Sequence, residues 1–286
     1  MAVSKAKTAA IAINLIVFII VTILNYFSTK SGKVFPKATG KVSDDHPTEV
    51  TPAGSTFAIW GFIYIYQLAW VIYSLTLLCR NAPDILPTSF YVSFTFATIF
   101  NFLWLFVWSR EHLGLAFVFI ALIGIFLEVC LYFSFTSLNR YIETLQNGDS
   151  TPSVTDVWCI RMLVHNGIIF YTTWVTVATC LNLTIVLQYD LEANGSKAAL
   201  GSLIILFLII VVWFLLENFA FGAYTRFTFT EYIVLIVALS GILKKNWTDG
   251  KGNQGFVMFL LVLSALLLIS RLVVIFVKER KLGFRV

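Results

Sequence analysis

Long apolar runs dominate the sequence, and short polar or turn-forming stretches separate them. A helix needs about 20 predominantly apolar residues to cross the hydrocarbon core of a bilayer. Eight runs satisfy this requirement, and each predicts a membrane-spanning helix. They cover residues 9–28, 56–79, 89–108, 113–138, 157–187, 198–221, 224–243 and 255–277.

The runs are too long and too continuously apolar to be the strands of a membrane barrel. A backbone in lipid must satisfy its own hydrogen bonds, which a helix does within one segment. The predicted fold class is therefore an all-α membrane protein, a polytopic bundle of about eight transmembrane helices. Because most connections are short, successive helices are expected to be antiparallel neighbours.

Composition and charge support a membrane location and exclude two other classes of protein. Hydrophobic residues make up 59% of the chain and charged residues 12%, so the polar surface is too small to coat a soluble globule. The net charge of +5 sits in short clusters at helix ends, which argues against nucleic-acid binding. The four cysteines have no paired metal spacing, and we interpret them as packing residues.

One connection is much longer than the others, residues 29–55, between the first and second predicted helices. A loop of that length in a compact bundle is typical of a lid or a binding segment. We expect it to cover a pocket.

The charges near the helix ends leave the orientation nearly balanced, but two features favour one topology. The basic tail after residue 277 shares a side with the basic N-terminus, and the sequons at Asn194 and Asn246 share the other side. Both termini are therefore expected to be cytoplasmic. The sequence does not identify which membrane houses the protein.

Three predicted helices carry a stripe of aromatic and polar side chains at three- and four-residue spacing, which puts each stripe on one helix face. The candidate ligand-binding residues on these stripes are Trp60, Tyr64, Gln67, Asn101, Trp104, Tyr171, Trp174 and Asn182. The amides also fit a simpler interpretation, in which they join helices through hydrogen bonds. Tryptophans in the middle of a span are not explained by the interfacial belt, so we expect them to line an apolar pocket.

Five ionisable residues lie within the predicted helices, where an unpaired charge is expensive. They are Glu128, Arg161, His165, Glu217 and Arg271. The two arginines are near helix ends and are expected to extend toward the interface. Arg161 and His165 share a helix face, so both are candidates to line a polar cavity with Glu128 or Glu217, and His165 joins the candidate ligand-binding residues.

The sequence contains no motif for catalysis or metal binding. Gly-rich phosphate loops, nucleophile elbows and paired-histidine zinc motifs are absent from it. His165 has no second ligand at metal spacing, so no metal site and no catalytic residue are predicted.

Three stretches, in order along the chain, resemble the translocator protein or tryptophan-rich sensory protein (TspO/MBR) family, in particular its longer relatives. These stretches are Thr51-Pro52-Ala53-Gly54 with Phe57, Ile59-Trp60-Gly61 and Ile63-Tyr64; Asn101-x-x-Trp104 with Gly114 and Ala116; and Tyr171-x-x-Trp174-x-x-x-Ala178-Thr179-x-Leu181-Asn182. The resemblance covers about residues 10–190.

The resemblance implies a five-helix core, residues 1–190, with the lid loop 29–55, followed by additional transmembrane helices in residues 191–286. It also implies a cavity beneath the lid for a tetrapyrrole, a sterol or another flat hydrophobic molecule. A tetrapyrrole or another pigment is then the candidate cofactor. The sequence departs from the family pattern at Leu105, Phe106, Phe119 and Phe170, so ligand specificity does not carry over.

The leading functional hypothesis is an integral membrane receptor or sensor for a small hydrophobic ligand, with the bilayer as its other partner. One alternative is a transporter of such a molecule, for which broken helices and facing charges are expected. Another is an intramembrane enzyme that acts on lipid or pigment through His165 or Glu128. A homo-oligomer is compatible with each hypothesis.

Overall fold

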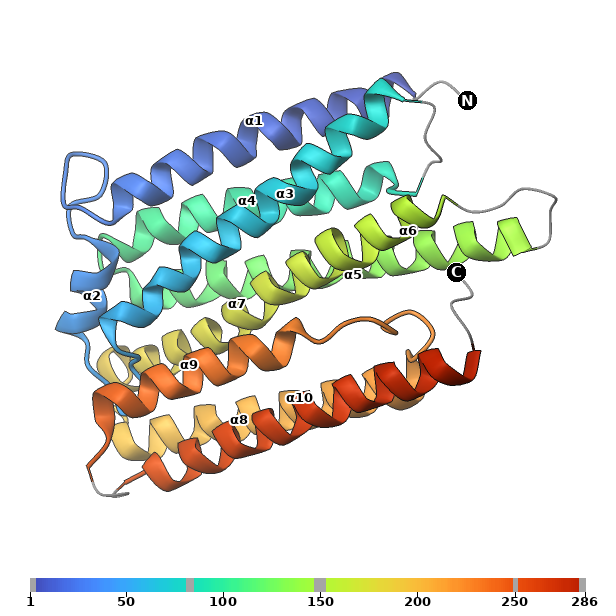
Figure 1. Cartoon of the computed structure of the whole chain (residues 1–286). Coiled ribbons are helices and arrows are strands. Elements are labelled where there is room, and N and C mark those ends of the chain that lie inside the picture. Colours follow the sequence, from blue (N-terminus) through green and yellow to red (C-terminus); the bar gives the residue numbers. More distant parts are fainter. Residues whose placement is uncertain (1–3, 81–84, 147–152, 249–251, 283–286) are drawn as a thin grey trace.

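The structure, a computed structural model, describes residues 4–80, 85–146, 153–248 and 252–282, and within these ranges all regular elements are helical. The helices lie side by side along one direction and form an antiparallel bundle (Figure 1). Seven of them are long and apolar enough to cross a membrane. The predicted fold class is confirmed.

The α-helices are α1 Lys5–Ser28, α2 Thr39–Asp45, α3 Ile59–Cys79, α4 Thr88–Trp108, α5 Leu113–Gln146, α6 Val154–Cys159, α7 Asn166–Ile185, α8 Gly195–Leu215, α9 Thr230–Asn246 and α10 Gln254–Leu282. A 3₁₀ turn, Gly54–Ala58, leads into α3. Wider π turns cover Ile160–His165, Val186–Asp190 and Leu216–Ala220. The first of these joins α6 to α7, and together with the second it makes one continuous span, Val154–Asp190.

Helix α5 continues past residue 138, where the sequence predicted its end. It has 34 residues, which at about 1.5 Å per residue exceeds the roughly 30 Å hydrocarbon core. The added residues, 139–146, are mostly polar and good helix formers, so they extend the helix beyond the apolar zone.

The predicted span 224–243 is wrong at its start, because α9 begins at Thr230 and has only 17 residues. The preceding backbone is not a regular helix, although Thr225, Phe227 and Thr228 are buried. Irregular backbone is tolerated at membrane depth only where the protein itself satisfies it. Here the side chains of Asn166 and Arg271 do so, by hydrogen bonds to the Phe227 and Thr228 carbonyls.

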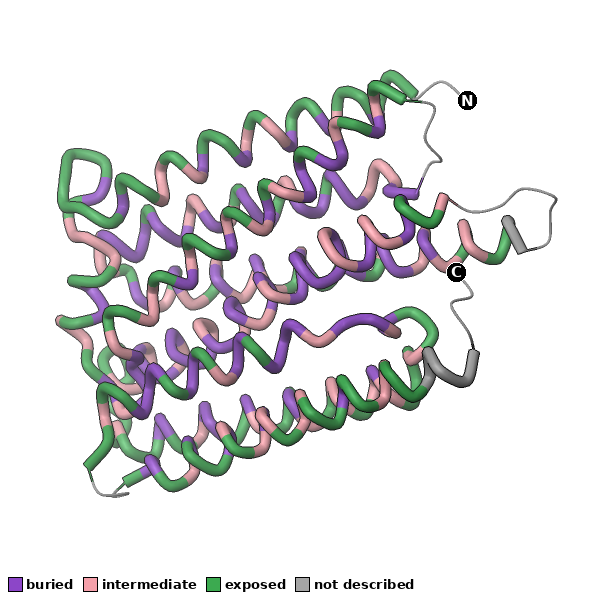
Figure 2. Tube along the Cα trace, viewed as in Figure 1, coloured by how far each residue is buried: buried purple, intermediate pink, exposed green. Residues whose placement is uncertain are grey.

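The central helix of the bundle is α7. Buried residues make up 67% of its most apolar stretch, against 22% in α1 and 17% in α10. Figure 2 shows the same gradient, with α1 and α10 largely exposed toward the surroundings. The exposed side chains of the outer helices are apolar, as lipid contact requires, and α7 is the element against which a site can be built.

The proposed division at residue 190 separates helices that pack together. On the C-terminal side, α8 and α9 both contact α7, and α9 also contacts α10. The lid segment, which contains α2, covers the end of the bundle opposite to the start of α1 and the end of α10 (Figure 1).

Candidate functional site

An aromatic cluster surrounds Trp60 near the lid end of the bundle. The Trp60 ring stacks on Tyr64 of its own helix, with centroids 5.9 Å apart, and on Trp104 of α4 at 6.1 Å. Offset stacking of this kind stabilises an aromatic pair beyond the area that it buries. The Trp104 ring continues the stack onto Trp108, at 5.8 Å.

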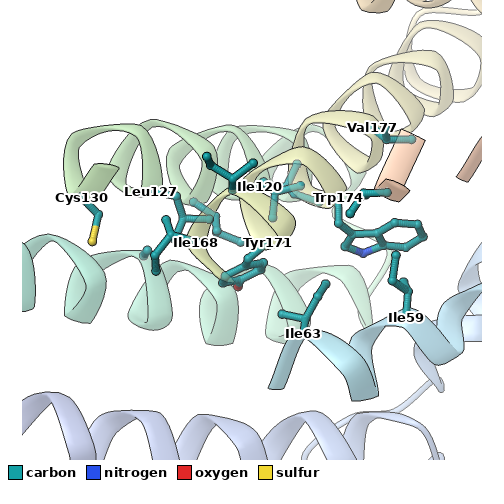
Figure 3. Packing of buried hydrophobic residues seen from close by; sticks show 14 of the residues in the cluster. Ile59, Ile63, Ile120, Leu127, Cys130, Ile168, Tyr171, Trp174 and Val177 are labelled. Carbon is teal, nitrogen blue, oxygen red and sulfur yellow. The ribbon is translucent and has the colours of Figure 1, made fainter. Parts of the chain in front are cut away.

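The central helix α7 closes the cluster from the other side. Tyr171 and Trp174 meet Trp60 edge to face, at 5.9 and 6.2 Å. Both rings project from α7 toward Ile59 and Ile63 of α3 (Figure 3). The spacing of three residues puts them on one face of α7, and their burial follows from the central place of this helix.

Asparagine side chains lie behind the rings. Asn101 accepts hydrogen bonds at Oδ1 from Asn25 Nδ2 at 2.7 Å and from the Tyr64 hydroxyl at 3.4 Å. Trp104 Nε1 donates to Asn182 Oδ1 at 3.4 Å. Two buried donors, Asn101 Nδ2 and Trp174 Nε1, have no partner among the described residues. These N–H groups can serve an acceptor supplied from outside the chain.

Gln67 does not join the cluster. Its Nε2 donates to the carbonyl of Gly167 at 2.8 Å, and its Oε1 accepts from Trp70 Nε1 at 2.7 Å. The side chain therefore ties α3 to α7, which is the simpler of the two interpretations given for the buried amides.

His165 also lies apart from the cluster, with its ring 4.3 Å from that of Phe135 on α5. Arg161 stands over the ring of Phe227 at 4.5 Å. Neither Arg161 nor His165 lines the cavity that contains Glu128, so their grouping with Glu128 or Glu217 stays a prediction. The expectation that Arg271 extends to the interface is wrong, since it is buried and pairs with Glu217 at 3.0 Å.

A cavity of about 530 Å³ lies between α1, α3 and α4, beneath the lid. This size falls within the range typical of small-molecule sites, roughly 300–1,000 Å³. Its lining comprises Thr22, Asn25, Tyr26, Ser28, Thr29, Thr39, Gly40, Asp44, Gly54, Phe57, Ala58, Trp60, Gly61, Tyr64, Trp104 and Leu105. A small recess beside it, bounded by Trp60, Trp104, Trp174 and Asn182, continues toward α7.

The lid is fixed to the core helices by hydrogen bonds and exposed ion pairs. Trp108 Nε1 donates to the Thr39 carbonyl at 3.1 Å, and Lys37 bridges Glu111 at 2.7 Å and Asp45 at 3.1 Å. Hydrogen bonds from Lys41 and then Lys37 hold the pKa of Asp45 below its ordinary value. Hydrogen bonds to Glu111 and Asp45 raise the pKa of Lys37.

The C-terminal helices hold the lid from its other side, a contact that sequence reasoning missed. The amide of Ala53 donates to the carbonyl of Gly241 at 2.9 Å, and Asn246 Nδ2 donates to the Thr51 carbonyl at 2.7 Å. An ion pair at 3.0 Å joins Lys245 to Asp44. Because Asp44 also lines the cavity, α9 is coupled directly to the wall of the site.

These features define the protein as a polytopic helical membrane protein with an aromatic-walled cavity under a lid. A model of the TSPO-like protein family matches residues 10–276 of the sequence. The chain belongs to this family, and the match extends through α8 and α9 and over most of α10. Searches of curated proteins and of solved structures found no match.

Proposed function

We propose that the protein is a membrane receptor or sensor that binds a flat hydrophobic molecule, tetrapyrrole- or sterol-like, in the cavity beneath the lid. The observation that carries this proposal is the wall made by Trp60, Tyr64 and Trp104, whose stacked rings face a cavity of about 530 Å³. Stacked aromatic faces complement a planar ring system and add stabilisation beyond apolar contact.

The unpartnered donors indicate that the ligand also carries a hydrogen-bond acceptor. A buried donor without a partner costs about 1–3 kcal/mol, which an acceptor on the ligand would recover. Trp174 Nε1 is such a donor, and Trp174 lines the recess next to the cavity, whereas Asn101 lines neither space. The favoured ligand therefore combines a flat apolar body with a carbonyl, carboxylate or ring-nitrogen acceptor.

The test uses the full chain in lipid nanodiscs, with protoporphyrin IX as a flat ring probe. Replacing Trp104 or Trp174 by Leu keeps the wall apolar but removes a stacking face, so binding should weaken by about 1 kcal/mol or more, roughly fivefold in Kd. Trp247→Leu, which alters an exposed tryptophan beside the lid, is the matched control.

A cavity-filling variant separates ligand binding from ring packing. Gly61 lines the cavity, and a Cβ added there meets open space, so Gly61→Leu projects into the site without a steric conflict at Cβ. It should abolish binding of the porphyrin in a folded protein. Unchanged binding in both Gly61→Leu and Trp104→Leu would reject this site.

A second candidate function is transport of the same class of molecule, and one observation favours it. Residues 221–229, the partly buried connection between the π turn Leu216–Ala220 and α9, lie next to Glu217, Glu231 and Arg271, and irregular backbone beside ionisable groups is a feature of transporters. Porphyrin accumulation in sealed proteoliposomes, measured against Gly61→Leu vesicles, distinguishes transport from binding alone.

A further inference from the structure

A second, smaller cavity lies on the other side of α7 from the aromatic cluster, between α5, α7, α8 and α9. Its volume is about 70 Å³. Its polar wall consists of Glu128, Thr172, Thr173, Thr176, Trp213, Glu231 and Tyr232. None of these residues lines the cavity under the lid.

Glu231 is the unusual member of this wall. The residue is 3% exposed, and neither carboxylate oxygen has a hydrogen-bond partner among the described residues. Its neighbour Glu217 is fully engaged, because it accepts from Thr228 Oγ1 at 2.6 Å and from the Tyr232 hydroxyl at 2.7 Å, and pairs with Arg271. Glu231 lies beside this network, close to Glu217 and Arg271, and its carboxyl also lines the cavity.

The rest of the wall is suited to a cation that carries N–H donors. Glu128 on α5 adds a second carboxyl, and the structure gives neither Glu128 nor Glu231 an ion pair with any described basic side chain. The hydroxyls of Thr172 and Thr176 donate to helix carbonyls, which leaves their oxygen lone pairs as acceptors. The indole ring of Trp213 offers a π face, on which a cation is stabilised.

Size and access decide which kind of cation fits. A volume of about 70 Å³ holds a head group of one or two waters' size, at about 30 Å³ each, but not a large ring. Glu128 and Ile209 of the wall are exposed on the apolar surface of the bundle, so the cavity opens toward lipid. A ligand enters sideways and leaves its apolar part among the acyl chains.

We propose that this cavity binds the protonated amino group of a membrane-dissolved lipophilic amine, with Glu231 as its main acceptor and Glu128 at the mouth. Binding supplies Glu231 with the partner that the fold does not, and pairing removes the cost of an isolated buried carboxylate. The site is independent of the ligand proposed for the cavity under the lid.

The first test needs no variant. Dicyclohexylcarbodiimide, a lipophilic reagent, modifies carboxyl groups in apolar surroundings, and peptide mass analysis locates the label on the full chain in nanodiscs. We expect Glu231 and Glu128 to be labelled, with at least tenfold slower labelling in the presence of octadecylamine. Octadecanol, with the same chain and no charge, should not protect them.

Binding of radiolabelled octadecylamine provides the second test. Glu231→Gln should weaken it at least tenfold, Glu128→Gln by a smaller factor, and Glu192→Gln, at an exposed loop carboxylate, should leave it unchanged. Equal protection by octadecanol, absence of label at Glu231, or undiminished amine binding by a folded Glu231→Gln variant would each overturn the proposal.

Discussion

The guanidinium of Arg271 donates hydrogen bonds to backbone carbonyls in the non-helical segment before α9. Its Nε donates to the Thr228 carbonyl at 2.9 Å, its Nη1 to Asn218 Oδ1 at 3.0 Å, and its Nη2 to the Thr225 carbonyl. The Glu217 carboxylate balances its charge. Asn166 adds a hydrogen bond to the Phe227 carbonyl and accepts one from the Phe229 amide, so two side chains together satisfy this irregular backbone.

Replacing Arg271 by Gln should destabilise the protein by about 3–5 kcal/mol, because it leaves Glu217 buried without its counter-charge. Thermal unfolding in mild detergent measures the change. Lys197→Gln, at an exposed position on α8, is the control and should have little effect. The double variant with Glu217→Gln should be less destabilised than the sum of the two single variants, and strict additivity would contradict the proposed pairing.

At the scale of residues, helical spacing predicted which aromatic rings come together, but not the hydrogen-bond partner of every amide. Helical spacing fixes the face on which a residue lies, and so it brought Trp60, Trp104 and Trp174 together. Gln67 follows the same spacing as Trp60, yet it bonds the Gly167 carbonyl, because a face can meet a neighbouring backbone as well as a cavity.

Asn25 was missed, although the sequence carries a signal for it. It lies eleven residues, about three helical turns, after Asn14, so the two amides share one face of an otherwise apolar helix. In the structure both bond to α4, Asn14 to Thr95 and Asn25 to Asn101.

Among the elements, the lid segment lies over the cavity and is the one that we expect to control exchange of the proposed ligand. It includes the short helix α2 and is held by α4 on one side and α9 on the other. If a ligand enters on this side, we expect the segment to be released from at least one of the two helices first.

Releasing the lid should therefore speed ligand dissociation. Trp108→Phe removes the donor to the Thr39 carbonyl, and Asn246→Ala removes the donor to the Thr51 carbonyl. Each should raise the dissociation rate of protoporphyrin IX severalfold in stopped-flow fluorescence, and the two together should raise it further. Asn139→Ala, near the far end of α5, is the control. Equal rates in all variants would show that the segment does not gate the cavity.

The same lid predicts a pH dependence. Lys41 and Lys37 lower the pKa of Asp45 in the folded protein, so the ionised Asp45 carboxylate stabilises the folded lid. This stabilisation is complete above the ordinary pKa range of a carboxyl group. This contribution is lost as the pH falls through the lowered pKa. Dissociation of the porphyrin should accelerate in that acidic range, and Asp45→Asn should remove the acceleration.

Hydrophobic periodicity and run length predicted the spanning helices because both depend on local sequence. The start of α9 could not be predicted in this way. Residues 224–229 contain three aromatic rings, which extended the apolar run, but side chains more than 40 positions away bond the Thr225, Phe227 and Thr228 carbonyls. Similarly, the attachment of the lid to α9 depends on pairs such as Thr51 and Asn246, which are distant in the sequence.

At the scale of the whole molecule, α1 begins and α10 ends at the same end of the bundle (Figure 1). We expect this end to be cytoplasmic, with the lid on the opposite side of the membrane. In glycosylation-competent cells, Asn194 should then carry a glycan, since its Oδ1 caps α8 and its Nδ2 makes no hydrogen bond within the described residues. Asn246 should be modified less, because its Nδ2 is already bonded to the lid.

A sequon engineered before residue 5 supplies the converse measurement and should stay unmodified. Glycosylation at that sequon, together with an unmodified Asn194, would show that the protein has the opposite orientation in the membrane. Endoglycosidase digestion and mass analysis of the peptides read out both positions.

The Arg271 contact also sets an order for biosynthesis. Glu217 and the carbonyls of Thr225 and Thr228 reach the bilayer when α8 and α9 are made, whereas their cationic partner arrives only with α10. Until then Glu217 has hydrogen bonds from Thr228 and Tyr232 but no counter-charge, and the Thr228 carbonyl lacks its donor from Arg271. The last helix to be synthesised therefore supplies the counter-charge for a carboxylate on an earlier one, and we expect a chain that ends before residue 271 to be less stable than the full chain.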